Sequence, residues 1–142
     1  MARVEIELPE RFPFATEIPV RISDINYGNH LGNDAVLTLA QEARVRWLAR
    51  HGWRELDIAG LGIVVADAAV VYRAEGRYGM VLRAELAWSD VRSRGLDLLY
   101  RFTDSATGRE IALAKTGIIF FDYAARKVAH LPEAFRRVVA RP

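Results

Sequence analysis

One segment in the first half of the chain has the repeat of an amphipathic helix. Within residues 34–51, apolar side chains recur three and four positions apart and share one helical face: Val36, Leu39, Ala40, Ala43 and Trp47. Asn33 is a good N-cap, and Asp34 places a negative charge in the first turn, where the helix dipole favours it. Gly52 follows as a C′ residue. The pattern therefore predicts one long helix over residues 34–51.

Five other segments have the composition or the alternation of β-strands. One precedes the helix and four follow it: residues 14–22, 62–72, 80–88, 96–103 and 110–122. Pro13 and Pro19 give the first strand an edge character, because proline cannot donate to a neighbouring strand. Turn residues separate the later strands, which favours an antiparallel sheet. Pro132 opens a short second helix that we expect to reach Val139.

These elements predict an α+β domain in which a long central helix is wrapped by a curved antiparallel sheet of about five strands. A length of 142 residues fits one domain, residues 1–142. Both edges of the sheet stay open, so we expect a homodimer or homotetramer formed by pairing across an edge. Four apolar residues of the later strands are interpreted as core rather than as a ligand pocket: Val64, Val65, Phe120 and Phe121.

Composition and charge exclude several classes of function. The net charge is +2, and no basic block alternates with aromatic residues, so no nucleic-acid partner is expected. The chain has no cysteine and its three histidines are far apart, so we expect neither a metal site nor a cofactor. The N-terminal residues lack the apolar stretch of a signal peptide, and no run of apolar residues is long enough to cross a membrane. These features predict a cytoplasmic protein.

The loop before the helix carries an unusual set of polar and turn residues. Residues 20–33 read V-R-I-S-D-I-N-Y-G-N-H-L-G-N, and residues 42–44 read E-A-R. The two segments resemble the V-R-x-x-D-x-D-x-x-G-H-V-N-N and E-A-R motifs of the hotdog-fold acyl-CoA thioesterases of the 4-hydroxybenzoyl-CoA thioesterase type. Weaker similarity extends the resemblance over residues 14–137. The resemblance implies a hotdog fold and hydrolysis of an acyl-CoA to a free acid and CoA.

The same resemblance places the thioester carbonyl at the start of the central helix, where free N–H groups and the helix dipole stabilise negative charge. It points to the backbone N–H of Asn33 as the oxyanion donor, with Gly32 permitting close approach and Tyr27 contacting the substrate. The usual catalytic aspartate of the family falls at Asn26. Asparagine is neutral and can only hydrogen-bond the carbonyl or hold a water. The base must therefore come from another residue.

Three residues are candidates for this base. His30 can act as a base near neutrality, or it can position the loop by hydrogen bonding. Glu42 lies on the helix, where an ordinary ion pair with Arg46 is the competing interpretation. Asp24 can act as a base, or it can cap N–H groups of the loop. The sequence leaves these alternatives open.

The phosphates of CoA need basic side chains, and four candidates lie at strand ends: Arg92, Arg94, Arg126 and Lys127. Asn26 also supports a different class of function, a hotdog protein that binds an acyl thioester without turning it over. A third interpretation is a structural or assembly domain, since one fold carries many roles.

Overall fold

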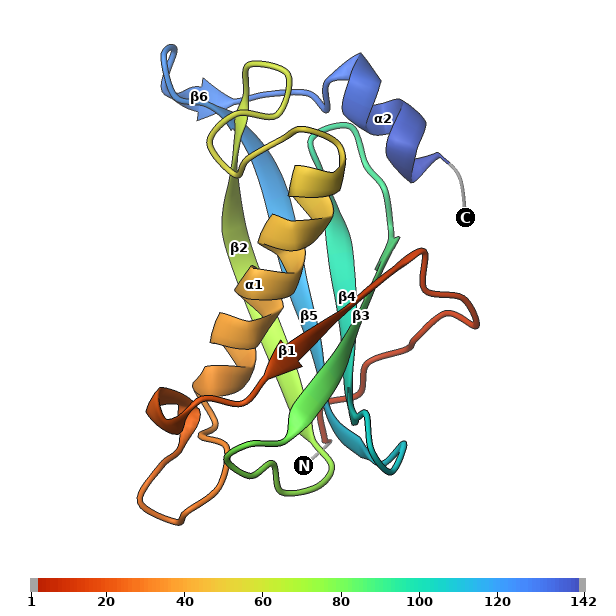
Figure 1. Ribbon diagram of the computed structural model, residues 1–142. Helices are drawn as coiled ribbons and strands as arrows, with labels where there is room; N and C mark the ends of the chain where they lie inside the picture. The colour runs from red at the N-terminus through yellow and green to blue at the C-terminus, as the bar shows by residue number, and fades with distance from the viewer. Residues whose placement is uncertain (1–2, 141–142) are drawn as a thin grey trace.

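Six antiparallel strands form one sheet in the computed structural model, which describes residues 3–140 (Figure 1). In chain order the elements are β1 (Phe14–Pro19), the 3-10 turn η1 (Ile22–Asp24), α1 (Ala35–Arg50), β2 (Gly62–Tyr72), β3 (Val81–Ser89), β4 (Gly95–Asp104), β5 (Glu110–Asp122), β6 (Lys127–Val128) and α2 (Glu133–Val139). The strands lie in the order β1-β3-β4-β5-β2, and β6 pairs with β5. The predicted α+β class is confirmed.

The sixth strand corrects the prediction of about five. Lys127 and Val128 pair with Asp122 and Phe121 after a tight turn in which Arg126 has a φ of 56°. The carboxylate of Asp122 accepts the N–H groups of the next turn residues and so stabilises this reversal. Two residues are too short a segment to produce a periodic pattern, which is why the strand is not visible in the sequence.

Helix α1 lies across one face of the sheet and buries the predicted apolar stripe (Figure 1). Leu39, Ala40 and Ala43 are at most 1% exposed. The sheet contributes the alternate residues of β4, which are fully buried: Leu96, Leu98, Tyr100 and Phe102. Because every second side chain of a strand points to the same face, these residues and the helix stripe form one continuous core.

The two ends of α1 differ slightly from the prediction. The N-cap is Asp34 rather than Asn33, because the N–H of Ala35 bonds the carbonyl of Gly32 and tightens the chain before the helix begins. Gly52 has a φ of 77°, as expected of a C′ residue. Before the helix, β1 ends at Pro19 rather than at residue 22, since the chain turns into η1.

The open edges of the sheet are β1 and β2. The edge character predicted for the first strand is confirmed. Helix α1 packs mainly against β1, β3 and β5 and leaves much of β2 uncovered. Val65 is 47% exposed, so its interpretation as core is wrong, whereas Phe120 is fully buried. A register shift between Val65 and Asp67 interrupts the pairing of β2 with β5 at this point.

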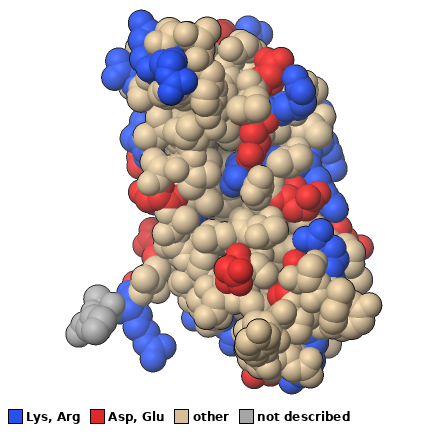
Figure 2. Space-filling model, turned by 90° about the vertical axis from the view of Figure 1, so that its left-hand side faces the viewer, with Lys and Arg blue, Asp and Glu red and all other residues tan. Residues whose placement is uncertain are grey.

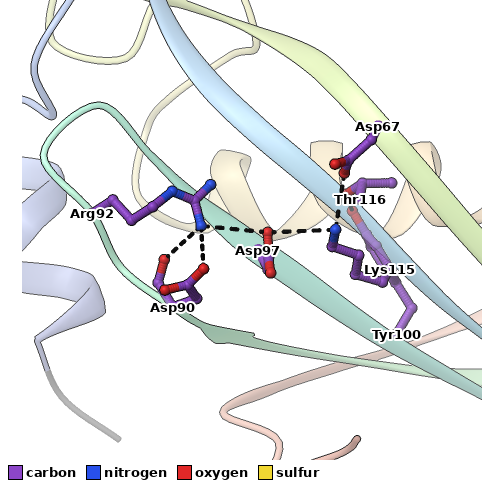
Figure 3. A network of polar contacts seen from close by, with 7 residues as sticks. All are labelled: Asp67, Asp90, Arg92, Asp97, Tyr100, Lys115 and Thr116. Carbon is purple, nitrogen blue, oxygen red and sulfur yellow. Dashed lines mark hydrogen bonds and ion pairs between the residues drawn. The ribbon is translucent and has the colours of Figure 1, made fainter. Parts of the chain in front are cut away.

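Two polar networks cross the sheet. On the helix side, buried Arg44 donates to the carboxylate of Glu55 and to the hydroxyl of Tyr100, which also bonds Thr116. Burial raises the pKa of Tyr100, so its hydroxyl keeps its proton. On the other side, Lys115 lies 2.9 Å from the carboxylate of Asp67, and the chain of charges continues to Asp97 and Arg92 (Figure 3).

Candidate active site

A hollow of about 650 Å³ lies between the loop after β1 and the first turn of α1. Four of the predicted site residues line it: Asp24, Asn26, Tyr27 and Gly32. Asp34 and Thr38 of the helix line it as well. The hollow therefore joins the loop that carries the resemblance to the N-terminus of the helix.

The loop is folded back on itself like a small hairpin. Ile25 and Leu31 form an isolated antiparallel bridge, and the N–H of Asn26 donates to the carbonyl of His30 at 3.0 Å. The side-chain oxygen of Asn26 accepts the N–H of Gly28 at 2.9 Å. This bond uses one of the two lone pairs of the amide oxygen, and the NH₂ group remains able to donate two hydrogen bonds. Tyr27, at the tip, is fully exposed.

Asn29 occupies the position where the family motif has a glycine. Its φ is 65°, in the left-handed region that glycine adopts readily and that asparagine tolerates better than most residues. Asparagine at this position is therefore compatible with the left-handed backbone that the loop adopts.

Two backbone N–H groups are free at the start of the helix. The N–H of Gly32 donates to the backbone carbonyl of Asp24, and that of Ala35 donates to the backbone carbonyl of Gly32. The N–H groups of Asn33 and Asp34 make no hydrogen bond within residues 3–140. A Cβ atom on Gly32 would lie 2.9 Å from the carboxylate of Asp34, so a larger residue would force these groups apart. Adjacent free N–H groups at a helix N-terminus can stabilise an oxyanion.

His30 is half-buried beside this helix start. Its Nδ1 lies 3.4 Å from the carbonyl oxygen of Leu31, which is a weak contact. With Asn33 it lines a second hollow of about 260 Å³, which Tyr72 of β2 also borders. A Cβ atom on Gly28 would lie 3.1 Å from His30 Nε2 and 3.3 Å from Asn26 Oδ1, so both side chains approach the same point.

The other two candidate bases have carboxylates that are already in contact with arginines. Asp24 is buried and accepts the backbone N–H of Arg21 at 2.8 Å, and the Arg21 guanidinium lies 3.3 Å away. Glu42 pairs with Arg46 at 2.8 Å, and Arg46 also donates to β1. Glu42 does not line the hollow at the helix start. The structure thus brings Asp24 to the hollow and leaves Glu42 two turns away.

The four basic candidates lie at the other end of the molecule. Arg92 and Arg94 belong to the β3–β4 turn, Arg126 to the β5–β6 turn and Lys127 to the start of β6. The loop with Asn26 lies at the opposite end of α1 (Figure 1). Sixteen residues of helix span roughly 24 Å. Figure 2 shows a cluster of lysine and arginine side chains at the top of the view, with others scattered over the rest of this face. One chain alone does not bring these residues to the helix start.

Two further residues of this region belong to the site although the sequence did not indicate them as site residues. In the sequence, Asp34 reads as a negative charge that the helix dipole favours. In the structure it also lines the hollow. Tyr72 donates its hydroxyl to the carbonyl of Asn33 at 3.0 Å, a contact that joins residues 39 positions apart. For Asp34 its position next to Asn33 is the available clue, whereas for Tyr72 no local pattern indicates the contact.

The described residues hold neither a metal-ligand cluster nor a membrane-spanning helix. Within residues 3–140, no group of three or more His, Cys, Asp or Glu side chains is placed to hold a metal ion. Among the helices of the same residues, none has the length and apolar character needed to cross a membrane.

The fold occurs in solved structures of low sequence identity. Slr0204, a 1,4-dihydroxy-2-naphthoyl-CoA thioesterase from Synechocystis, is 18% identical with a TM-score of 0.82, and the match covers 90% of this chain and 96% of that chain. The PA2801 protein of Pseudomonas aeruginosa is 21% identical with a TM-score of 0.82, covering 91% and 99%. BH1999, a gentisyl-coenzyme A thioesterase, is 16% identical with a TM-score of 0.77, covering 87% and 99%.

At such identities these likenesses establish a common fold, and the family is shown by a separate comparison. No curated protein matches the sequence. The profile of the Thioesterase-like superfamily matches residues 20–139, which include the loop, α1 and every strand after it. The chain belongs to the Thioesterase-like superfamily.

Proposed function

We propose that this protein is an acyl-CoA thioesterase of the 4-hydroxybenzoyl-CoA thioesterase type, and that it holds the thioester carbonyl at the N-terminus of α1. The observation that carries the proposal is the pair of free N–H groups of Asn33 and Asp34 at the start of α1. Asp34 lines one hollow together with Asn26, and Asn33 lines the neighbouring hollow together with His30. Donors arranged before the reaction stabilise the negative charge that develops on the carbonyl oxygen.

Asn26 suits a polarising role in this site. Its side-chain oxygen accepts the N–H of Gly28, and its NH₂ group can donate to a ligand. An amide NH₂ can donate to the carbonyl oxygen but cannot accept a proton from water. Gly32 allows close approach, and Tyr27 at the loop tip can contact the rest of the substrate.

The acyl group that we propose is aromatic. The resemblance to the 4-hydroxybenzoyl-CoA type supports this choice, and two solved structures of the same fold are described as thioesterases of naphthoyl-CoA and gentisyl-CoA. The test offers the purified protein benzoyl-CoA, 4-hydroxybenzoyl-CoA, hexanoyl-CoA and palmitoyl-CoA and follows free thiol. We expect a higher kcat/KM for the two aromatic esters, and a preference for palmitoyl-CoA would contradict the aromatic assignment.

A second copy of the chain can complete the site. Strand β2 is an edge with unpaired backbone groups, and its Val65 is 47% exposed (the edge faces the viewer in Figure 2). When two such edges pair antiparallel, the start of one β2 lies opposite the end of the other. The basic turn of the partner would then lie near Tyr72 and the helix start of this chain. We therefore propose a homodimer in which Arg126 and Lys127 of the partner subunit contact the CoA phosphates.

Two variants test this arrangement. Val65→Arg places a charge on the pairing edge and should convert the dimer to a monomer in sedimentation velocity. The double variant Arg126→Gln, Lys127→Gln should raise KM for acyl-CoA several-fold with little change in kcat, because it removes phosphate contacts away from the carbonyl. Arg109→Gln, in the β4–β5 turn, serves as a control for lost surface charge. An unchanged KM in the double variant would exclude this phosphate site.

The identity of the base is tested with the same assay. His30, Asp24 and Glu42 are the candidates that the sequence indicates, and the variants His30→Ala, Asp24→Asn and Glu42→Gln test each of them. Loss of a general base should lower kcat by about 10²–10⁴. The contacts of Asp24 and Glu42 with arginines favour a structural role for both.

The alternative function is binding of an acyl thioester without turnover. It is supported by Asn26, which stands where the family has a catalytic acid. Tight binding of acyl-CoA by calorimetry, with no thiol release above background, would favour it. A cytoplasmic location remains a prediction from the sequence.

A further inference from the structure

The N-cap residue of α1 presents a carboxylate that has no structural partner within residues 3–140. Asp34 is the N-cap of α1, yet its side chain makes no capping hydrogen bond. Within residues 3–140 it takes part in no ion pair, whereas Asp24 and Glu42 are both paired with arginines. Its exposed side chain lines the same hollow as Asn26. A carboxylate without a partner at this position is available to a ligand.

Gly32 brings this carboxylate close to Asn26. A Cβ atom built on Gly32 would lie 2.9 Å from Asp34 Oδ1 and 3.7 Å from the Cβ atom of Asn26. The carboxylate and the stem of the amide side chain therefore approach one point, although they belong to the helix and to the loop. A group bound in the hollow can contact both side chains at once.

We propose that Asp34 is the general base of the thioesterase reaction and replaces the acid that is missing at position 26. This inference rests on the proposed thioesterase function. Its support is positional: among the described residues that line the hollow, Asp34 combines a free backbone N–H with an unpaired carboxylate. In this proposal the N–H groups of Asn33 and Asp34 hold the carbonyl oxygen of the thioester. The carboxylate of Asp34 then lies beside the carbonyl carbon that water attacks.

The reaction balances with water as the only other reactant. The water oxygen attacks the thioester carbon, a C–O bond forms, and one water proton passes to the carboxylate of Asp34. The oxyanion formed in this step is held by the two N–H groups and the NH₂ group of Asn26. Collapse of the adduct breaks the C–S bond, and the protonated Asp34 returns the proton to the leaving thiolate. The products are the free acid and CoA thiol.

The competing role for Asp34 is structural, as an ordinary N-cap or a favourable charge at the helix dipole. Asp34→Asn separates the two roles. Asparagine is as good an N-cap as aspartate, so the variant keeps the capping residue and removes the carboxylate with its charge. Loss of the charge–dipole interaction acts on stability, whereas loss of a base acts on kcat. Asp57→Asn is the matched control, because Asp57 is an exposed aspartate in the connector after α1, at the other end of the helix.

The experiment measures thiol release from benzoyl-CoA by the full-length wild-type protein and by three variants. We expect Asp34→Asn to lower kcat by about 10²–10⁴ while KM stays within threefold of the wild-type value and thermal unfolding is unchanged. Asp57→Asn should retain wild-type kcat. The double variant Asn26→Asp, Asp34→Asn moves the carboxylate to the loop side of the same hollow, and it should recover at least tenfold in kcat over Asp34→Asn.

Two results would overturn the assignment of Asp34. One is a kcat for Asp34→Asn within threefold of wild-type; the other is a double variant no faster than Asp34→Asn. An inactive wild-type protein would contradict the proposed thioesterase function itself, and the assignment of Asp34 would fall with it. The two failures are therefore distinguishable.

Discussion

The phenol hydroxyl of Tyr72 donates a hydrogen bond of 3.0 Å to the carbonyl oxygen of Asn33. Tyr72 is the last residue of β2 and Asn33 precedes α1, so the contact joins the open edge of the sheet to the helix start. The carbonyl of Asn33 and the N–H of Asp34 belong to one planar peptide unit. The bond therefore orients one of the two N–H groups of the proposed oxyanion site.

Tyr72→Phe removes this bond and keeps the aromatic ring. A hydrogen bond of this kind contributes about 1 kcal/mol, so we expect kcat to fall by roughly three- to tenfold. A loss of at most about 1 kcal/mol should lower the melting temperature by no more than a few degrees. Tyr123→Phe, in the β5–β6 turn, is the control in steady-state assays of thiol release. Unchanged kcat in Tyr72→Phe would show that the peptide unit is held without this bond.

Asn29 has a left-handed backbone at the tip of the loop, with a φ of 65°. Asn29→Gly should leave the free energy of unfolding within about 0.5 kcal/mol of wild-type, because glycine adopts this conformation at no steric cost. Asn29→Ala should lower it by about 1–2 kcal/mol, because a Cβ without a polar side chain is disfavoured there. Urea denaturation measures both variants. Equal stability of the two would mean that the loop adopts another backbone conformation.

Lys115 and Asp67 form an ion pair across β5 and β2 whose contribution depends on pH (Figure 3). The hydrogen bond from Lys115 lowers the pKa of Asp67, and the same bond raises the pKa of Lys115. Because its pKa is lowered on folding, the ionised carboxylate of Asp67 stabilises the fold above about pH 4. This contribution is lost as the pH falls through the lowered pKa. Because its pKa is raised on folding, the charged ammonium group of Lys115 stabilises the fold below about pH 10. This contribution is lost as the pH rises through the raised pKa.

The test compares melting temperatures of wild-type, Asp67→Asn, Lys115→Met and the double variant from pH 2 to pH 11. The coupling between the two substitutions should be present near neutrality and should decline toward both ends of the range. Exposure of the carboxylate and salt both keep the effect small. A coupling that is the same at pH 2.5 and pH 7 would contradict the assignment of the pKa shifts.

Tyr100 carries the buried hydroxyl that connects Arg44 with Thr116. Tyr100→Phe leaves the guanidinium N–H of Arg44 and the hydroxyl of Thr116 without this partner in the core. An unsatisfied buried polar group costs about 1–3 kcal/mol, and we expect the free energy of unfolding to fall by that amount. Urea denaturation at pH 7 measures the change, with Tyr123→Phe as an exposed control. A loss below about 0.5 kcal/mol would indicate that water replaces the hydroxyl.

Local patterns were sufficient for most of the elements. The bounds predicted for β2 and β5 agree with the structure, and the predicted helix differs from α1 by one residue at each end. Apolar residues repeat every two positions in a strand and every three to four in a helix, because one face of the element is buried. The pattern of burial can therefore be read along the chain. β6 was not predicted, because a strand of two residues shows no periodic pattern. Val65 was misassigned because apolar residues at an edge strand look like core residues in sequence.

The candidate site was predictable only where it is local. The loop of residues 23–33 and the helix start are adjacent in the chain, so their motif alone indicates that Asn26 and Gly32 lie together, with Asn33 next to Gly32 in the chain. Whether a carboxylate is paired or free depends on neighbours elsewhere. Asp24 and Glu42 are in ion pairs, Asp34 is in none within residues 3–140, and this difference is a property of the folded chain.

By itself, the sequence determined the α+β class, the long helix, the edge position of the first strand and the loop at which the site begins, because each follows from residues close together in the chain. Tertiary structure decided the rest. It placed Arg126 and Lys127 a helix length away from Asn33, brought Tyr72 to the carbonyl of Asn33 and left β2 uncovered. Such relationships depend on the packing of distant segments, and no local periodicity records them.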